Sequence, residues 1–151
     1  MKDRYVKRGS WRSFIEPERG EEVVYKINSI RQVIEGKEMI LVDYSIVRDT
    51  SSKMIVRNKL KTAKKVFLLI TFPPIMYPCY AGIDFPTQEE LIAYRVCKNT
   101  LNLSEINKRV SKEIEMDFLG YNDVESLSKG IGMPMDQLYL SCTTGDCSYL
   151  K

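Results

Sequence analysis

The sequence predicts an α/β fold in which a parallel sheet is followed by C-terminal helices. Two continuous apolar runs, Met39–Val42 and Val66–Phe72, have the composition of strands that are buried on both faces of a parallel sheet. Between them, Val56, Leu60 and Ala63 recur at helical spacing. This strand, helix, strand order forms a βαβ unit, whose crossover is almost always right-handed.

Composition narrows the functional classes. The chain has 151 residues, 44% of them hydrophobic and 28% charged, which is typical of one soluble domain. It contains no histidine, so His-based catalytic triads, Cys-His nucleophile pairs and histidine-ligated zinc motifs are excluded. The net charge of +3 is too small to indicate nucleic-acid binding, and no nucleic-acid partner is expected.

Cysteine usage and hydropathy indicate a cytoplasmic protein with free thiols. The four cysteines are Cys79, Cys97, Cys142 and Cys147, and no secretory signal pattern accompanies them. The longest strongly apolar run, Val66–Phe72, is far shorter than the roughly 20 residues that a membrane span requires. We therefore expect no membrane association.

The chain divides into three segments. Residues 1–20 are predicted to be a basic flexible loop, 21–72 a βαβ core and 73–151 a C-terminal helical part. In the first segment, Lys2–Arg12 contains five basic residues and no amphipathic period, which also fits a solvated tail. In the second, Glu22–Ile27 has the pattern of a short strand.

Capping and spacing signals place the remaining elements. The helix before the second apolar run is predicted to begin at Ser52, with Ser51 or Ser52 as its N-cap. Prolines make Phe72–Pro86 an extended connection. The other predictions are a helical turn over Ile30–Ile34 ending at Gly36; a helix over Gln88–Arg95; a helix carrying Leu103, Ile106, Val110 and Ile114 with Ser104 as N-cap; a strand over Asp117–Tyr121; and a helix over Asp123–Lys129 closed by Gly130 and Gly132.

The loop within Ile40–Ser52 is the strongest candidate site. Ligands of α/β sheets bind outside the carboxyl ends of the strands, and a helix N-terminus after a hydroxyl-rich turn offers N–H groups to a phosphate. An alternative of equal weight is structural: Thr50, Ser51 and Ser52 cap the helix, and Asp43 ends the strand.

The same loop carries a family resemblance. The sequence ILVDYSIVRDTSS resembles the phosphoribosyl pyrophosphate (PRPP) motif of type I phosphoribosyltransferases, in the form VDDSIVRGTTS of the amidophosphoribosyltransferase family. Further matches occur in order from Lys2 to Asp146. They are KDRYV with SFIEP, KIN at Lys26–Asn28, FPPIMYPCYAGIDFPTQEELIA at Phe72–Ala93, DFLGYNDVESLSKGIG, and SCTTGD.

The resemblance implies part of a glycosyltransferase of purine biosynthesis. The family converts PRPP and glutamine or ammonia to 5-phosphoribosylamine, with Mg²⁺ as cofactor. The family's glutaminase domain and pyrophosphate-binding loop have no match in this chain, so activity is expected to need a separate glutaminase or transferase chain. The alternatives are a non-catalytic module that binds PRPP or a purine nucleotide, and a scaffold remnant.

The resemblance assigns PRPP-binding roles to individual residues. Asp43 matches the first of two acidic residues that hold the ribose hydroxyls and Mg²⁺, whereas Tyr44 replaces the second. Ser45, Arg48 and, from the KIN match, Lys26 are also placed in the PRPP site.

The 5′-phosphate cradle is matched by Thr50, Ser51 and Ser52. Asp49 stands where the family has glycine, which adds a negative charge facing a phosphate. Together with Tyr44, this change predicts weaker PRPP binding.

Two further matches concern the flexible loop and the thiols. Lys2, Arg4 and Tyr5 match the loop that closes over PRPP in the family. Cys79 and Cys142 match two of the four iron–sulfur ligands found in a subgroup of the family, and Tyr139 occupies the third position. Two thiolates do not complete a four-ligand site, so no cluster is expected.

The partial match also has a consequence for the surface. Where strands of the complete domain would pack, we expect an exposed sheet edge and uncovered apolar surface. Self-association into a homo-oligomer is one way to cover them.

Overall fold

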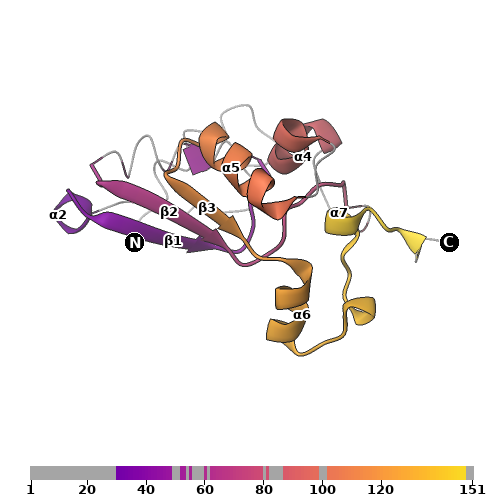
Figure 1. Cartoon of the computed structure of the whole chain (residues 1–151). Coiled ribbons are helices and arrows are strands. Elements are labelled where there is room, and N and C mark those ends of the chain that lie inside the picture. Colours follow the sequence, from indigo (N-terminus) through magenta and orange to yellow (C-terminus); the bar gives the residue numbers. More distant parts are fainter. Residues whose placement is uncertain are drawn as a thin grey trace, which may run out of the picture.

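The computed structural model describes residues 30–48, 52, 53, 55, 60, 62–79, 81, 87–98 and 102–148. They form a parallel sheet of three strands in the order β1-β2-β3. Figure 1 shows α5 lying along the sheet and α4 beside α5, with α6 and α7 beyond the carboxyl ends of the strands. The predicted α/β fold with a parallel sheet is therefore confirmed.

The described helices and strands have a simple order along the chain. In order they are α2 (Arg31–Ile34), β1 (Glu38–Asp43), β2 (Lys65–Ile70), the 3-10 turn η1 (Gln88–Glu90), α4 (Ile92–Cys97), α5 (Leu103–Glu113), β3 (Phe118–Tyr121), α6 (Val124–Ile131), the 3-10 turn η2 (Met135–Gln137) and α7 (Ser141–Thr144).

One face of the sheet forms the core. Leu41, Leu68 and Leu119 are in register across the three strands, and Leu68 and Leu119 are buried. On β2, burial alternates, so that Val66 and Ile70 lie on the same covered face as Leu68.

Both strand connections pack on this same face. The connection from β1 to β2 contributes Leu60, and the connection from β2 to β3 contributes Ile92, Ile106 and Val110, all in one cluster with Leu68. When successive parallel strands are added in one direction across a sheet, their right-handed connections lie on the same side of it. This explains why both connections cover one face.

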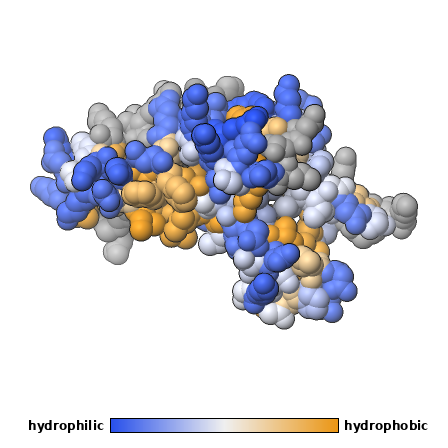
Figure 2. All heavy atoms as spheres, viewed as in Figure 1, coloured by the Kyte–Doolittle hydropathy of each residue, from blue (hydrophilic) through white to orange (hydrophobic). Residues whose placement is uncertain are grey.

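The prediction that β1 is buried on both faces is wrong. Ile40 and Val42 are 65% and 67% exposed, whereas Leu41 between them packs on the core. Continuous apolar runs are typical of strands with helices on both sides. Here the described residues cover only one side, so the outward half of the run remains on the surface, where Figure 2 shows an apolar patch over the strands.

The helix predicted from Ser52 is shorter than its apolar spacing suggests. Ser52, Lys53 and Ile55 are helical, but Leu60 lies in a bend, and the amide of Ala63 donates to the carbonyl of Leu60 across 2.8 Å in a turn. Leu60 and Ala63 still pack on the core, because a tight turn can present residues to one face as a helix does. Val56 and Ser51 lie outside the described residues.

The helix predicted over Gln88–Arg95 is divided in two. Leu91 has extended backbone angles (φ −71°, ψ 116°) and is fully buried, so η1 ends before it and α4 begins after it. A reciprocal capping box between Thr87 and Glu90 holds η1. Burying the Leu91 side chain between the two turns stabilises the structure more than one continuous helix would.

Two helix ends differ from their predicted caps. The N-cap of α5 is Asn102, whose side chain accepts from the amide of Glu105 at 3.2 Å, and Ser104 lies inside the first turn. The expected helix over Asp123–Lys129 is α6, which Asp123 caps and which runs on to Ile131. Only Gly132 closes it, with φ +76°, while Gly130 lies within the helix.

Burial on both faces is also wrong for the second apolar run, because Leu69 of β2 is 41% exposed. The remaining helix and strand predictions agree with the structure in position. The helical turn ending at Gly36 is α2, β2 ends two residues before the predicted Phe72, and β3 lies within Asp117–Tyr121. The strand predicted over Glu22–Ile27 lies outside the described residues. None of the helices in the described part of the chain has the length and apolar character needed to cross a membrane.

Candidate functional site at the carboxyl edge of the sheet

The three parallel strands end at one edge, and backbone hydrogen bonds hold the segments that leave them. The amide of Thr71 donates to the carbonyl of Asp43, and that of Phe72 donates to the carbonyl of Tyr44, both at 3.0 Å. The side-chain amide of Asn122, after β3, donates to the carbonyl of Thr71 at 3.1 Å. The start of the predicted PRPP loop is therefore fixed to its neighbours.

Asp43 presents an exposed carboxylate at the end of β1. One of its oxygens accepts a hydrogen bond from the amide of Tyr44 at 2.8 Å. This contact orients the carboxylate and leaves its other lone pairs available to a hydroxyl or a cation. No group of three potential metal-ligating side chains occurs in the described part of the chain.

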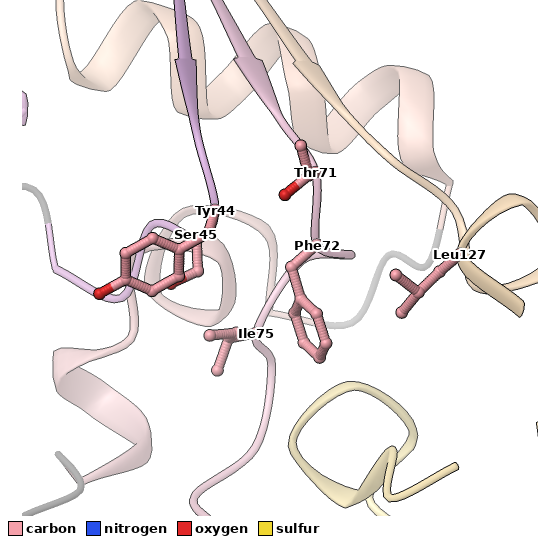
Figure 3. Close-up of a pocket in the computed structure, with 6 residues that line it drawn as sticks. All are labelled: Tyr44, Ser45, Thr71, Phe72, Ile75 and Leu127. Atoms are coloured by element: carbon pink, nitrogen blue, oxygen red, sulfur yellow. The ribbon is translucent and has the colours of Figure 1, made fainter. Parts of the chain in front are cut away.

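A pocket of about 320 Å³ opens beside Asp43. Figure 3 shows side chains from the β1 loop, the segment after β2 and α6 around it. Its walls are mainly apolar, and three of the six lining side chains carry a hydroxyl group. The lining residues are Tyr44, Ser45, Thr71, Phe72, Ile75 and Leu127.

Tyr44 takes the place of the family's second acidic residue at this pocket. It is 76% exposed, and Figure 3 shows its ring beside Ser45. A carboxylate there would contribute charge, whereas the phenol contributes an aromatic wall. The electrostatic attraction for a cation is accordingly left to Asp43.

Arg48 fixes the far end of the described loop. Its guanidinium forms an ion pair with Glu90 at 3.2 Å, and the amide of Ile92 donates to the carbonyl of Val47 at 3.0 Å. Hydrogen bonds from the Thr87 backbone and from Arg48 lower the pKa of Glu90, which keeps its carboxylate charged. Arg48 thus anchors the loop to η1 and α4.

Beyond Arg48, the structure describes one residue of the predicted phosphate cradle, Ser52, and the helical Lys53 that follows it. Ser52 is half-buried, and Lys53 forms an ion pair with Glu113 of α5 at 2.7 Å. Arg95 of α4 meets the same carboxylate at 3.4 Å. Of the predicted site residues, Lys2, Arg4, Tyr5, Lys26, Asp49, Thr50 and Ser51 lie outside the described residues.

The structure brings the cysteines of the iron–sulfur match together. The Cys79 sulfur lies 3.4 Å from the Tyr139 hydroxyl, and burial raises the pKa of the Cys142 thiol, with the nearby Cys79 adding to the shift. Iron–sulfur clusters are held by thiolates. Tyr139 places a phenol where the matched subgroup has its third ligand, so this match supplies two of the four thiolates.

Comparison with known proteins identifies the relationship. No family model matches the chain. The amidophosphoribosyltransferases of Methanocaldococcus jannaschii and Bacillus subtilis are 40% and 39% identical to it over 149 and 153 residues, which is 96% of this chain. The chain is homologous to part of the amidophosphoribosyltransferases. It spans 28% and 29% of the length of these two relatives.

Solved structures agree with the sequence relationship. The allosteric regulatory enzyme of purine biosynthesis superposes with a TM-score of 0.70 at 39% identity, covering 97% of this chain and 30% of that one. Glutamine PRPP amidotransferase from B. subtilis, in complex with ADP and GMP, gives 0.67 at 37% identity, with 97% and 31% covered. The resemblance to the phosphoribosyltransferase domain of amidophosphoribosyltransferases is thus confirmed.

Sequence reasoning missed several residues of the site. Thr71 and Phe72 follow β2 directly, so the rule that ligands bind at carboxyl ends of strands could have found them. Ile75 and Leu127 line the pocket from more distant parts of the chain. No local motif signals their position, because only the tertiary fold brings α6 to this edge.

Proposed function

We propose that this chain forms the phosphoribosyl-binding part of an amidophosphoribosyltransferase of purine biosynthesis. In that reaction a C–N bond forms between ammonia, released from glutamine, and ribose C1 of PRPP, while the C–O bond to pyrophosphate breaks. The observation that carries the proposal is the loop from Asp43 to the helical Ser52, at the carboxyl edge of a parallel sheet, in a chain 40% identical to such enzymes.

Asp43 has the chemistry to hold the ribose and the metal. Its carboxylate accepts hydrogen bonds from ribose hydroxyls and serves as one ligand to Mg²⁺. Protein Mg²⁺ sites commonly use one or two carboxylates, with substrate phosphates and water completing the octahedron. When bound, Mg²⁺ would neutralise charge on the departing pyrophosphate.

Thr50, Ser51 and Ser52 are proposed to cradle the 5′-phosphate. Hydroxyl groups and backbone amides at the start of a helix suit a phosphate. The helical state of Ser52 and Lys53 supports this role. The ion pairs of Arg48 with Glu90 and of Lys53 with Glu113 hold the chain before and after the cradle.

Turnover is proposed to require more of the enzyme than this chain spans. The aligned region is 28% of the M. jannaschii relative. Catalysis of a displacement at ribose C1 depends on positioning both the attacking ammonia and the leaving pyrophosphate. Those functions belong, in this proposal, to the remaining part of an amidophosphoribosyltransferase, including a glutaminase that supplies ammonia.

Thermal unfolding with Mg-PRPP tests the proposal. A ligand at about 100 times its Kd adds about 2.7 kcal/mol of stability to the folded state. We expect an Mg²⁺-dependent rise in Tm that exceeds the rise with ribose 5-phosphate alone. Ser51→Ala should remove it, whereas Ser104→Ala on the exposed start of α5 should not.

A second variant distinguishes a weakened PRPP site from the absence of a PRPP site. Tyr44→Asp combined with Asp49→Gly restores the acidic pair and the glycine of the family motif, so it should strengthen the Tm shift with Mg-PRPP. If neither the natural chain nor this variant responds to Mg-PRPP, the phosphoribosyl-binding function is wrong.

A further inference from the structure

Two of the four cysteines lie together where the segment after β2 meets α7. Cys79 is half-buried, and Cys142 is buried. Both belong to one apolar cluster, in which Cys142 packs with Ile75 and Leu91, and Cys79 lies against them. Burial is the main cause of the raised pKa of the Cys142 thiol, and the nearby Cys79 contributes to it. The two thiols are therefore neighbours in space, although they are far apart in the sequence.

Backbone contacts hold the two chain segments against each other. The amides of Met76 and Tyr77 both donate to the carbonyl of Cys142, at 2.8 Å and 2.9 Å. Directly after α7, Gly145 lies so close to the Tyr77 ring that an added Cβ would be 3.1 Å from it. These contacts fix α7 on the segment that leads to Cys79, so the two cysteines are carried by adjoining backbones.

The contact with Tyr139 shows where the Cys79 side chain points. The Cys79 sulfur lies 3.4 Å from the Tyr139 hydroxyl. Tyr139 is three residues before Cys142, at the turn into α7. The sulfur of Cys79 is thus directed at the segment that carries Cys142.

We propose that Cys79 and Cys142 are a site of thiol oxidation, at which hydrogen peroxide produces a reversible disulfide. In the first step, peroxide converts the Cys79 thiol to a sulfenic acid and releases water. In the second step, the Cys142 sulfur attacks the Cys79 sulfur, so the S–S bond forms and the S–O bond breaks. The hydroxyl group leaves as water with the Cys142 proton. The two sulfurs lose two electrons, and the peroxide oxygens gain them.

Exposure assigns the two roles. Solvent reaches the half-buried Cys79, whereas Cys142 is 8% exposed. A sulfenic acid condenses with a thiol that lies beside it. Cys79 is therefore the sulfur that meets the oxidant, and Cys142 is the thiol that resolves the sulfenic acid.

The other two cysteines lie elsewhere. Cys97 is buried in the larger core cluster, with Ile106 and Val110. Cys147 follows α7 beyond Gly145 and is half-buried. Neither is among the described residues that pack in the cluster around Cys142. Both serve as internal controls for the selectivity of oxidation.

The disulfide would lie behind the pocket at the carboxyl edge of the sheet. Phe72 and Ile75 line that pocket, and both also pack in the cluster that contains the two cysteines. Figure 3 shows their side chains on the pocket wall. An S–S bond would tie α7 to the segment that carries Ile75. The inference goes beyond the proposed function, because it does not depend on which ligand the pocket takes.

Peptide mapping of the full chain tests the proposal. The reduced chain is treated with hydrogen peroxide, unfolded in the presence of an alkylating reagent, and digested for mass spectrometry. We expect two of the four thiols to be lost to one disulfide, between Cys79 and Cys142 of the same chain. Cys97 and Cys147 should remain alkylated, and dithiothreitol should restore both lost thiols.

Three single variants separate the roles of the thiols. Cys79→Ser should abolish the disulfide, whereas Cys147→Ser, at the other half-buried cysteine, should leave it unchanged. Cys142→Ser should leave Cys79 as a sulfenic acid, which dimedone labels. Urea unfolding of each reduced variant checks that the fold persists, and the mapping of the natural chain needs no variant.

Urea unfolding of the oxidised chain gives an independent measurement. A crosslink that closes a long loop restricts the unfolded chain. Because the structure already holds the two cysteines together, the oxidised chain should unfold at a higher urea concentration than the reduced chain. Peroxide should cause no such shift in Cys79→Ser.

Several results would overturn the proposal. They are survival of all four thiols in peroxide, a disulfide that includes Cys147, a disulfide between two copies of the chain, and a lower urea midpoint of the oxidised chain. The last would show that the bond distorts the fold. The assay contains no PRPP, so its failure would leave the proposed function untouched.

Discussion

The two faces of the sheet differ although the same strands build both. On the core face, Leu68 is 4% exposed, whereas its neighbour Leu69 on the opposite face is 41% exposed. Both residues belong to one apolar run, so hydrophobicity alone does not decide which side of a strand is covered. The direction in which right-handed crossovers step decides it.

Truncation of these two neighbours should give the largest contrast. Leu68→Ala removes side-chain contacts inside the core, and we expect it to lower the free energy of unfolding by about 2–5 kcal/mol. Leu69→Ala should cost less than about 1 kcal/mol, because most of the hydrophobic stabilisation scales with area removed from water. Urea unfolding of the isolated chain measures both. Equal losses would mean that the face carrying Leu69 is covered in solution.

The sequence predicted the strands of the sheet but not which of their faces is covered. The apolar run around Leu41 predicted a buried strand, and Leu41 does pack on the core. The same run predicted burial of Ile40 and Val42, which are exposed. A sequence pattern indicates which side chains of a strand are suited to burial. It does not show whether the described residues bury them.

The same limit applies to the site. The motif identified residues that are neighbours in sequence, but not the contacts that only the tertiary fold creates. The motif located Asp43 and Tyr44 because their neighbours in sequence form the loop. It did not indicate that Arg48 pairs with Glu90, or that Leu127 reaches the pocket. Those contacts depend on where η1 and α6 pack, and no spacing rule along the loop encodes that placement.

Tyr121 tests the core face through its buried hydroxyl. The side chain is 7% exposed, and its hydroxyl makes no hydrogen bond to any residue that the structure describes. A buried polar group without a partner is costly, so Tyr121→Phe should be neutral or raise the free energy of unfolding by up to about 1 kcal/mol at pH 7.

The advantage of this substitution should grow at alkaline pH. Burial, with a smaller contribution from Cys97, raises the pKa of Tyr121 above its ordinary value of 10.0. The unfolded chain then releases this proton above about pH 10 while the folded chain retains it, so stability falls as pH rises further. Tyr121→Phe removes that component. Urea midpoints at pH 7, 10 and 11 measure it, and a constant difference between the two proteins would show that the raised pKa is wrong.

Glu113 tests the ion pairs at the outer edge of the core. Its carboxylate links Lys53 and Arg95 to α5 at 2.7 Å and 3.4 Å, which ties the start of the PRPP loop helix to the core layer. Glu113→Gln should lower the free energy of unfolding by about 0.5–1 kcal/mol, because partly exposed ion pairs are weak.

The matched control for Glu113 is Glu105→Gln on the same helix. Among the described residues, Glu105 forms its ion pair within α5, with Arg109 one turn away, so its loss should cost no more than about 0.5 kcal/mol. Thermal unfolding at low and high salt separates the two. If both substitutions behave alike, Glu113 does not tie the layers together.

Gly120 should give the smallest effect in the isolated chain and is the sharpest probe of the exposed face of the sheet. An added Cβ would lie 3.2 Å from the Phe118 ring and 3.3 Å from a Leu69 methyl group. These are side-chain atoms on an uncovered surface, so they can move outward. The conformational advantage of alanine over glycine in a strand offsets this adjustment, and we expect Gly120→Ala to change the free energy of unfolding by less than about 0.5 kcal/mol.

Urea unfolding of Gly120→Ala beside the natural chain measures this change. A loss of stability in the isolated chain above about 1 kcal/mol would instead show that Phe118 and Leu69 are already confined. The two faces would then be covered alike, and the contrast between Leu68 and Leu69 would disappear with it.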